Sequence, residues 1–505
     1  MKVLNADQIR AADQRTIAEE EITSVALMER AAQAFTHWFT RKFSKQGKKI
    51  LICCGPGNNG GDGLAIARLL YEQQYSVAVW IISPENKFSP DFQANKQRLP
   101  NSISVTTITD KSNIPNVVSF DIIIDGLFGT GLARPVSGIF AAVINSINST
   151  AAVIVAIDVP SGLYSEKPNE PEAPIVSAGY TVCFELPKLA FLLPQNEKYV
   201  GEWHVVPIGL SPAYLQEAST NKWLTTADQI SGFMKRRGKF SHKGTYGHAL
   251  LLAGSYGKMG AAALAARACL RSGVGLLSLA CPRVGYTILQ TTVPEAMTMP
   301  DTNEMHLTLL PELSTYQAIG IGPGLGKEPD TQALVRQLLQ TTPVPLVLDA
   351  DALNILAEEK ELITLLPANS ILTPHPKEFE RLAGKAANDY HRLELLQDFC
   401  HQYNCYVILK GGHTCLGTPN GQLYFNITGN PGMATGGTGD TLTGIITALV
   451  AQQYSSLEAC LLGVYVHGLA GDLAKNKLGE MALIASDVID HLGPAFLQLQ
   501  PSAKA

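Results

Sequence analysis

The sequence is short of charged residues. Only 16% of its 505 residues are Asp, Glu, Lys or Arg, the formal net charge is −5, and no strongly basic block occurs. Nucleic acid and anionic membranes are therefore poor candidate partners, and we expect neither. Together with a hydrophobic content of 46%, the low charge argues against disorder and indicates compact, well-buried α/β domains.

The signals of several other protein classes are missing. The nine cysteines form no CxxC pair and no His/Cys cluster at zinc spacing, so we expect reduced, buried thiols. The N-terminus, MKVLNADQIRAADQRT, is polar and helical in pattern, unlike a signal peptide. No apolar run reaches the length needed to span a bilayer. These absences predict a soluble, cytoplasmic protein.

The chain is too long for one ordinary core, which favours two domains, with three possible. Residues 207–228 lack clear periodicity and form the best boundary. We expect domains at 1–212 and 226–500, joined by a linker at 213–225. Both halves alternate strands and helices without a fixed period, so no internal repeat is inferred.

Apolar runs predict the strands of both halves. After an amphipathic helical segment at 1–38, runs this apolar, spaced by helices, indicate parallel sheets covered on both faces. Residues 166–174 are rich in proline and charge and predict a surface loop. One helix is expected to follow the glycine-rich turn after the first strand and to extend through Leu70. Two others are expected at Ala261–Ser272 and Asp330–Gln340. The expected strands are Ile50–Cys54, Val77–Ile82, Asp121–Asp125, Ala152–Ile157, His248–Ala253, Ala318–Ile321, Leu346–Leu348, Ser370–Leu372 and Val407–Leu409.

Three polar loops follow strands of the first half. They are 55–63 (GPGNNGGDG), 125–135 (DGLFGTGLARP) and 158–162 (DVPSG). Loops at the carboxyl ends of parallel strands converge on one crevice. Oxygen ligands at Asn59, Asp125 and Ser161 suit a hard cation. A structural tight turn explains the glycines alone but explains two asparagines and an aspartate less well. The usual GxGxxG register and a Walker lysine are both absent.

The most informative stretch of the second half is 436–440 (GGTGD), which precedes an apolar helical pattern. A glycine-rich turn opening a helix presents backbone N–H groups to phosphate. Asp440 is then expected to handle a proton or a metal ion; the alternative is an ordinary helix N-cap. Further candidates are the loops 254–261 and 320–326, His375 between two prolines, and the segment 410–414 (KGGHT).

The three loops of the first half resemble the NAD(P)H-hydrate epimerase family, over roughly residues 1–210. The resemblance implies a Rossmann-like α/β/α sandwich and a potassium ion held by Asn59, Asp125 and Ser161. Inversion of a carbinolamine carbon requires an acid/base, and Asp158 is our hypothesis for it. The substrate contacts that the resemblance implies are Asn58, Asn59, Gly60, Gly61, Asp62, Gly129, Thr130, Gly131, Leu132, Ala133, Arg134, Pro135 and Asp158.

The second half, about 226–500, resembles the ADP/ATP-dependent NAD(P)H-hydrate dehydratases, with a ribokinase-like α/β/α fold. By that resemblance Asp440 is the catalytic base and Gly436–Gly439 stabilise the transferring phosphoryl group. The implied contacts to hydrated nicotinamide are Ala262, Gly324, Leu325, His375 and Asp440. The implied nucleotide-binding residues are Lys410, Gly411, Gly412, His413, Thr414, Gly436, Gly437, Thr438 and Gly439.

Together the resemblances imply one bifunctional repair enzyme for NADHX and NADPHX. It would interconvert the R and S hydrates and dehydrate the S form with ADP and Mg²⁺, releasing AMP and phosphate; the motifs leave ADP against ATP open. A homo-oligomer is plausible. The alternative is a ribokinase-like vitamin kinase fused to a non-catalytic NNGGDG domain. A dehydrogenase is a weaker alternative, because the dinucleotide fingerprint is absent.

Overall fold

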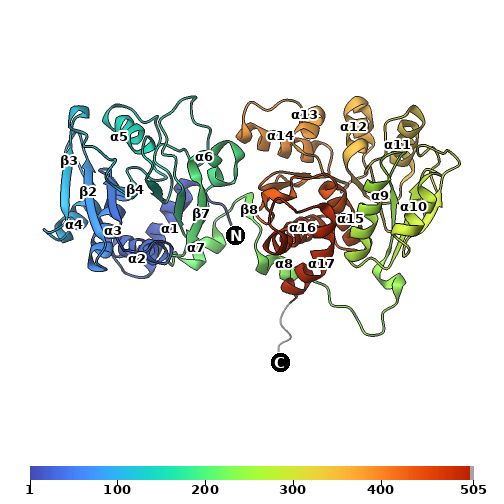
Figure 1. Ribbon diagram of the computed structural model, residues 1–505, viewed down its shortest axis with the longest axis horizontal. Helices are drawn as coiled ribbons and strands as arrows, with labels where there is room; N and C mark the ends of the chain where they lie inside the picture. Colours follow the sequence, from blue (N-terminus) through green and yellow to red (C-terminus); the bar gives the residue numbers. More distant parts are fainter. Residues whose placement is uncertain (501–505) are drawn as a thin grey trace. The chain divides into compact units, whose positions relative to one another are not determined.

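The computed structural model describes residues 1–500 (Figure 1). The chain forms two compact units. One contains Lys2–Thr220 with Asn388–Tyr390, and the other contains Met1, Asn221–Ala387 and the residues from His391 on. We call them the N-terminal and C-terminal units. The α/β fold class predicted from the sequence is confirmed in both.

The N-terminal unit is built on a seven-stranded sheet in the order β3-β2-β1-β4-β5-β6-β7, with every neighbouring pair parallel. The strands are β1 (Lys49–Cys54), β2 (Ser76–Ile82), β3 (Ser104–Ile108), β4 (Ile122–Gly126), β5 (Val153–Ile157), β6 (Tyr180–Phe184) and β7 (Glu202–Val206). The helices are α1 (Ala6–Glu19), α2 (Ser24–Lys42), α3 (Asn58–Glu72), α4 (Pro90–Arg98), α5 (Gly138–Asn148), α6 (Glu197–Val200) and α7 (Pro212–Glu217). The sequence predicted the four strands β1, β2, β4 and β5 but not β3, β6 or β7.

Side-chain alternation along β1 shows why this sheet is covered on both faces. Ile50 and Ile52 pack in the core that contains residues of α2 and α3, whereas Leu51 and Cys53 pack in the core that contains residues of α5. All four are fully buried. A strand buried on both faces must be apolar throughout, as this one is. Residues 166–174 contain no helix or strand, which confirms the predicted loop.

The C-terminal unit contains a ten-stranded sheet in the order β11-β10-β9-β12-β13-β14-β15-β16-β17-β8. Pairing is parallel from β11 to β15, antiparallel through the β15-β16-β17 meander, and parallel again between β17 and β8. The strands are β8 (Lys222–Leu224), β9 (His248–Leu252), β10 (Leu276–Cys281), β11 (Met297–Pro300), β12 (Ala318–Ile321), β13 (Leu346–Leu348), β14 (Ile371–Leu372), β15 (Tyr406–Leu409), β16 (Thr414–Gly417) and β17 (Leu423–Asn426). The five predicted strands correspond to β9, β12, β13, β14 and β15.

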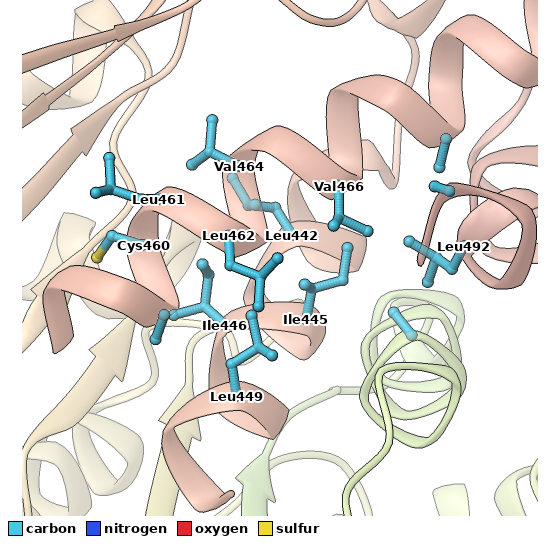
Figure 2. Packing of buried hydrophobic residues seen from close by; sticks show 14 of the residues in the cluster. Leu442, Ile445, Ile446, Leu449, Cys460, Leu461, Leu462, Val464, Val466 and Leu492 are labelled. Atoms are coloured by element: carbon cyan, nitrogen blue, oxygen red, sulfur yellow. The ribbon is translucent and has the colours of Figure 1, made fainter. Parts of the chain in front are cut away.

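Helices of this unit are α8 (Ala227–Phe233), α9 (Met259–Arg271), α10 (Gly285–Thr292), α11 (Pro329–Thr341), α12 (Ala350–Glu358), α13 (Pro376–Ala383), α14 (Asp389–Gln402), α15 (Thr438–Ala451), α16 (Ser456–Leu478) and α17 (Ala485–Leu499). Figure 2 shows the core where α15, α16 and α17 meet. Leu442, Ile445 and Leu449 come from α15, and Leu462 and Leu492 come from α16 and α17. This packing anchors the helix that begins at the GGTGD turn.

Helix α16 corrects one expectation. Its 23 residues, Ser456–Leu478, are long and apolar enough by length and composition to cross a membrane, with a mean hydropathy of 1.3. No apolar segment of that length was expected from the sequence. Within the structure, however, 61% of the apolar window is buried in protein, which is how the core helix of a globular domain behaves.

The predicted linker, 213–225, has regular structure of its own. It contains most of α7 and all of β8, which pairs with β17 in the C-terminal sheet. The compact units divide between Thr220 and Asn221, inside the expected linker. Local periodicity could not reveal β8, because a strand of three residues is too short to show it.

Candidate active sites

A cavity of about 880 Å³ lies at the carboxyl edge of the N-terminal sheet. The loops after β1, β4 and β5 all reach it, as the motif positions predicted, and α1 forms a further part of its wall. The predicted contact residues that line it are Asn58, Asn59, Asp62, Gly129, Thr130, Gly131, Leu132, Ala133, Arg134 and Asp158. The other three, Gly60, Gly61 and Pro135, do not line it.

Gly60 and Gly61 have a packing role in this structure. A Cβ on Gly60 would lie 1.8 Å from the Gly55 carbonyl oxygen, and one on Gly61 would lie 2.9 Å from the Met28 sulfur. Both distances are shorter than atoms tolerate. These glycines let the start of α3 lie against the turn after β1 and against α2, which positions Asn59 and Asp62 at the cavity.

Oxygen atoms converge below the cavity around the buried Asp125 carboxylate. Its Oδ1 accepts a hydrogen bond from Ser161 Oγ at 2.6 Å, and its Oδ2 accepts one from the Ser161 amide at 2.7 Å. The Asn59 amide donates to the Phe128 carbonyl at 2.9 Å. The three residues predicted to hold a cation are therefore brought together. Burial raises the pKa of Asp125 to about 6, although the hydrogen bonds from Ser161 and Leu127 oppose the shift. No Lys or Arg within residues 1–500 forms an ion pair with it.

Asp158 is held by a lysine that the motifs did not include. The Lys188 ammonium lies 3.0 Å from Asp158 Oδ1 and is 2% exposed. It also donates to the Leu186 carbonyl at 3.1 Å. The adjacent negative charge outweighs burial and raises the pKa of Lys188 above its ordinary value. Asp158 has a φ of 62°, a left-handed conformation that is uncommon outside glycine but that aspartate and asparagine adopt more often than most residues. The turn after β5 thus directs this carboxylate to the cavity.

Two more carboxyl groups reach the same cavity. Asp13 lies on α1, and Asp62 is the fifth residue of α3. Burial is the main cause that raises the pKa of Asp13 to about 6, and the charge of Asp158 adds to it. Burial raises the pKa of Asp62 well above its ordinary value, with Asp158 and Asp13 contributing. Asp13 and Lys188 were missed because each lies outside any motif.

In the C-terminal unit, the GGTGD turn has the geometry expected of an anion site. Gly437 precedes α15 with a φ of 93°, and a Cβ there would lie 2.5 Å from Leu264 Cδ1. The helix begins at Thr438, so Asp440 lies within its first turn. The N-cap is Gly437, which excludes the ordinary N-cap explanation for Asp440. The free N–H groups of the first turn carry the positive end of the helix dipole.

Asp440 titrates near neutrality. Its pKa is raised to about 7, first by burial and then by the negative charges of Asp349 and Asp351, while Lys410 opposes the shift. A carboxyl with this pKa is poised to accept and return a proton at cellular pH. Perturbed values of this kind are typical of functional sites.

A buried ion pair lies beside the turn. Lys410 Nζ is 2.9 Å from Asp349 Oδ1, and Thr443 Oγ1 donates to Asp349 Oδ2 at 2.7 Å. Asp349 is 2% exposed, and its pKa is lowered because Lys410 and the hydroxyl stabilise the anion against burial. A Cβ on Gly439 would lie 3.3 Å from Lys410 Nζ. Lys410 and the glycine turn therefore adjoin one another, as predicted.

Asp349 and Asp351 were not singled out from the sequence. They follow β13 in the run Asp-Ala-Asp, and Ala350 between them has a φ of 48°. Asp351 Oδ2 accepts from the Gly326 amide at 2.9 Å and lies 3.3 Å from Lys258 Nζ. Two aspartates directly after a predicted parallel strand were the available signal.

Among the predicted nicotinamide contacts, Ala262 and Leu325 are fully buried, and Gly324 has a φ of 60°. A Cβ on Gly324 would meet the Lys258 carbonyl oxygen at 2.8 Å, so its loop packs on the start of α9. The contact of Ala262, Gly324 and Leu325 to a ligand stays a prediction.

His375 caps α13, and its Nδ1 accepts from the amides of Lys377 and Glu378 at 3.1 and 3.3 Å. The Nε2 atom lies 3.5 Å from Glu378 Oε1, on a ring that is half-exposed. The segment Gly411–Gly412 is exposed and joins β15 to β16, with Thr414 beginning β16.

The protein is an α/β enzyme with two sites. One unit contains a cavity lined by carboxyl groups, and the other contains a helix that begins at a glycine-rich turn beside a Lys–Asp pair. A family model described as NAD(P)H-hydrate dehydratase matches residues 249–493, and one described as YjeF-related protein N-terminus matches residues 24–190. A ribokinase-like superfamily protein from Enterococcus faecalis has a TM-score of 0.50 at 26% identity, covering 56% of this chain and 98% of that chain.

Similarity also extends over the whole chain. The Bifunctional NAD(P)H-hydrate repair enzyme Nnr of Moorella thermoacetica is 36% identical, covering 97% of this chain and 96% of the relative. The protein of the same name from Escherichia coli is 32% identical, covering 96% and 92%. An ADP/ATP-dependent NAD(P)H-hydrate dehydratase from Bacillus subtilis, crystallised with ATP and Mg²⁺, gives a TM-score of 0.48 at 33% identity, covering 55% of this chain and 98% of that chain.

The chain belongs to the family of bifunctional NAD(P)H-hydrate repair enzymes. This membership confirms the family that the motifs indicated. It favours the repair function over a vitamin kinase fused to a non-catalytic domain, because relatives of one description match both halves together.

Proposed function

We propose that this chain interconverts the R and S hydrates of NADH and NADPH in its N-terminal unit and dehydrates the S form in its C-terminal unit, with Mg²⁺-ADP as phosphoryl donor. The observation that carries the proposal is Asp440. A carboxyl whose pKa is raised to about 7 stands in the first turn of a glycine-opened helix, next to the buried Lys410–Asp349 pair.

This arrangement suits transfer of phosphate to an alcohol followed by elimination. Asp440 takes the proton of the substrate hydroxyl, and the oxygen attacks the terminal phosphorus of ADP, releasing AMP. The amides of Gly436–Gly439 stabilise the charge that develops on the transferring group. Lys410, positioned by Asp349, supplies a cation to the phosphates. The phosphate ester then leaves with its C–O electron pair, a ring proton is lost, and the dihydropyridine is restored.

The N-terminal cavity suits inversion at a hydroxylated ring carbon. Asp158 serves as an acid/base there, and its charge is held by Lys188 at 3.0 Å. Asn59, Asp125 and Ser161 would hold a potassium ion, since they and the Phe128 carbonyl offer only oxygen ligands. The fit rests on the fully buried Asp125 carboxylate, which has no cationic side chain paired with it in residues 1–500. A bound K⁺ would neutralise that charge.

Absorbance of reduced nicotinamide tests both activities at once. A mixture of R and S hydrates is incubated with the full chain and Mg²⁺-ADP, and in parallel with Mg²⁺-ATP. Complete recovery of the reduced cofactor is expected with the parent protein. With the Asp158→Asn variant, recovery of the reduced cofactor should stop near the amount of S hydrate initially present. With Asp440→Asn, no reduced cofactor should be recovered. No recovery with either nucleotide would refute the proposal, and faster recovery with ATP would correct the donor.

A further inference from the structure

We infer that Asp13, on helix α1, is a second acid/base residue of the N-terminal site and works with Asp158, whose charge Lys188 holds in place. This inference deepens the proposed epimerisation and rests on it. Helix α1 forms a part of the cavity wall to which none of the three predicted loops contributes.

Helix α1 turns one face to the cavity. Its lining residues Ile9, Asp13 and Ile17 recur every four positions, with Arg10 and Gln14 beside them, which is the spacing of one helical stripe. The adjoining face is anchored in the unit, because Ala12 and Thr16 are fully buried and Thr16 Oγ1 accepts from the Ser211 amide at 2.8 Å. The helix therefore presents Asp13 to the cavity from a fixed scaffold.

The charges buried at the cavity favour a proton on one of its carboxyl groups. Asp13, Asp62, Asp91 and Asp158 line it, and its buried cation is Lys188, since Arg10 and Arg134 are exposed. Negative charges that are desolvated without a partner are costly, and Lys188 pairs directly with Asp158. The pKa values of Asp13 and Asp62 are the raised ones, so we place the proton on one of these two.

Asp13 is better suited than Asp62 to exchange that proton. Asp62 lies near Cys54 and Asp91, and burial raises its pKa well above its ordinary value, which disfavours loss of its proton. The pKa of Asp13, at about 6, lies near the operating pH, where a catalytic acid/base is most effective. Neighbouring carboxyl groups with separated pKa values are the usual sign of divided acid and base roles.

The groups facing Asp13 come from several elements. Asp158 and Lys188 face it from the sheet edge, Asp62 from α3 with Asp91 of α4 behind, and Arg10 and Arg134 line the same cavity. The two nearest influences oppose one another, since Asp158 raises the pKa of Asp13 and Lys188 lowers it.

The chemistry balances with this pair. Asp13 gives its proton to the departing hydroxyl as the C–O bond breaks, so water leaves and the ring nitrogen lone pair forms C=N⁺. Water adds to the carbon from the other side, the C=N π electrons return to nitrogen, and Asp158 accepts the proton that water loses. That proton returns to Asp13 through solvent, which restores the starting state. The step needs no oxidant or reductant.

Epimer interconversion without nucleotide tests the inference. Separated R hydrate is incubated with full-length parent, Asp13→Asn, Asp13→Glu and Asp7→Asn, and the S hydrate is quantified by chromatography. Asp7 is a matched control, because it lies on the same helix with its side chain 83% exposed. We expect Asp13→Asn to lower the rate of epimer interconversion by about a hundredfold or more. Asp13→Glu should retain most of the parent rate, and Asp7→Asn should stay within twofold of it.

The pH profile separates catalysis from structure. An acid must carry its proton, so the parent rate should fall about tenfold per pH unit above a pKa near 6, and this limb should vanish in Asp13→Asn. A rate within threefold of the parent, an unchanged limb, or a loss matched by a lower melting temperature in both Asp13 variants would overturn the inference. If the parent itself does not accelerate interconversion, the proposed function has failed instead.

Discussion

Each unit of this protein contains a buried aspartate–lysine pair, and the two pairs are used differently. Asp349 and Lys410 lie 2.9 Å apart, with the aspartate 2% exposed and the lysine 24% exposed. Asp158 and Lys188 lie 3.0 Å apart, with the aspartate 14% exposed and the lysine 2% exposed. The C-terminal pair thus offers its cation to the site, whereas the N-terminal pair offers its anion.

The difference matches the chemistry we propose for each site. Phosphoryl transfer needs a positive group near phosphates, and inversion of a carbinolamine needs a base. In both units a separate carboxyl with a pKa nearer neutrality stands beside the pair, Asp440 in one and Asp13 in the other. Both sites therefore combine a charged group held by an ion pair with a neighbouring titratable carboxyl. The charge that faces the site is positive in the C-terminal unit and negative in the N-terminal unit.

The largest expected effect is the loss of the C-terminal base. Asp440→Asn should lower the rate of S-hydrate dehydration by about a thousandfold, since the amide cannot take the hydroxyl proton. Epimer interconversion, followed without nucleotide, should stay within twofold of the parent. Because the two activities are read separately on one chain, each serves as the folding control for the other. Dehydration within tenfold of the parent would remove Asp440 from its role.

The second prediction breaks each pair in turn. Lys410→Met leaves the Asp349 carboxylate buried without its partner, which should cost about 3 kcal/mol or more of local stability. Lys188→Met should cost less, about 1 to 2 kcal/mol, because water in the cavity can solvate Asp158. Hydrogen exchange of peptides around residues 349 and 158 measures each unit by itself.

A matched control removes both partners. The double variant Lys410→Met with Asp349→Asn should regain most of the protection lost in Lys410→Met, since no buried charge remains. An equal or larger loss of protection in Lys188→Met than in Lys410→Met would contradict the proposed difference between the pairs.

Parts of both sites were predictable from sequence because parallel strands end at one edge of a sheet. That rule alone predicted that the segments containing Asn59, Asp125 and Asp158 lie at one edge of the sheet, where the cavity is. Lys188 and Asp13 were not predictable, since neither lies in a motif and each meets Asp158 only through the tertiary fold. Strands β6 and β7 were missed for a related reason: they mix aromatic and polar residues and are partly exposed, so no apolar run marks them.

The third prediction concerns pH. The folded pKa of Asp440, about 7, lies above its ordinary value, and a base must be deprotonated to act. Dehydration kcat/KM should therefore rise about tenfold per unit below pH 7 and level off above it. The same shift means that the folded state binds the extra proton between about pH 4 and 7, so stability falls as pH rises through that range. Asp440→Asn should then melt at a higher temperature than the parent at pH 8, and an equal or lower melting temperature would contradict the raised pKa.

The smallest expected effect concerns potassium at the N-terminal site. Replacing K⁺ with choline should slow epimer interconversion several-fold, because the buried Asp125 carboxylate would lose its counter-charge. Potassium should also raise the melting temperature of the parent by mass action, which reads binding without activity. Asp125→Asn removes the charge and should abolish both responses, whereas Asp121→Asn, with an exposed residue just before β4, should retain them. If K⁺ changed neither the rate nor the melting temperature of the parent, the oxygen atoms of Asn59, Asp125 and Ser161 would be satisfied by hydrogen bonds alone. The contrast between the units would then depend on the two aspartate–lysine pairs.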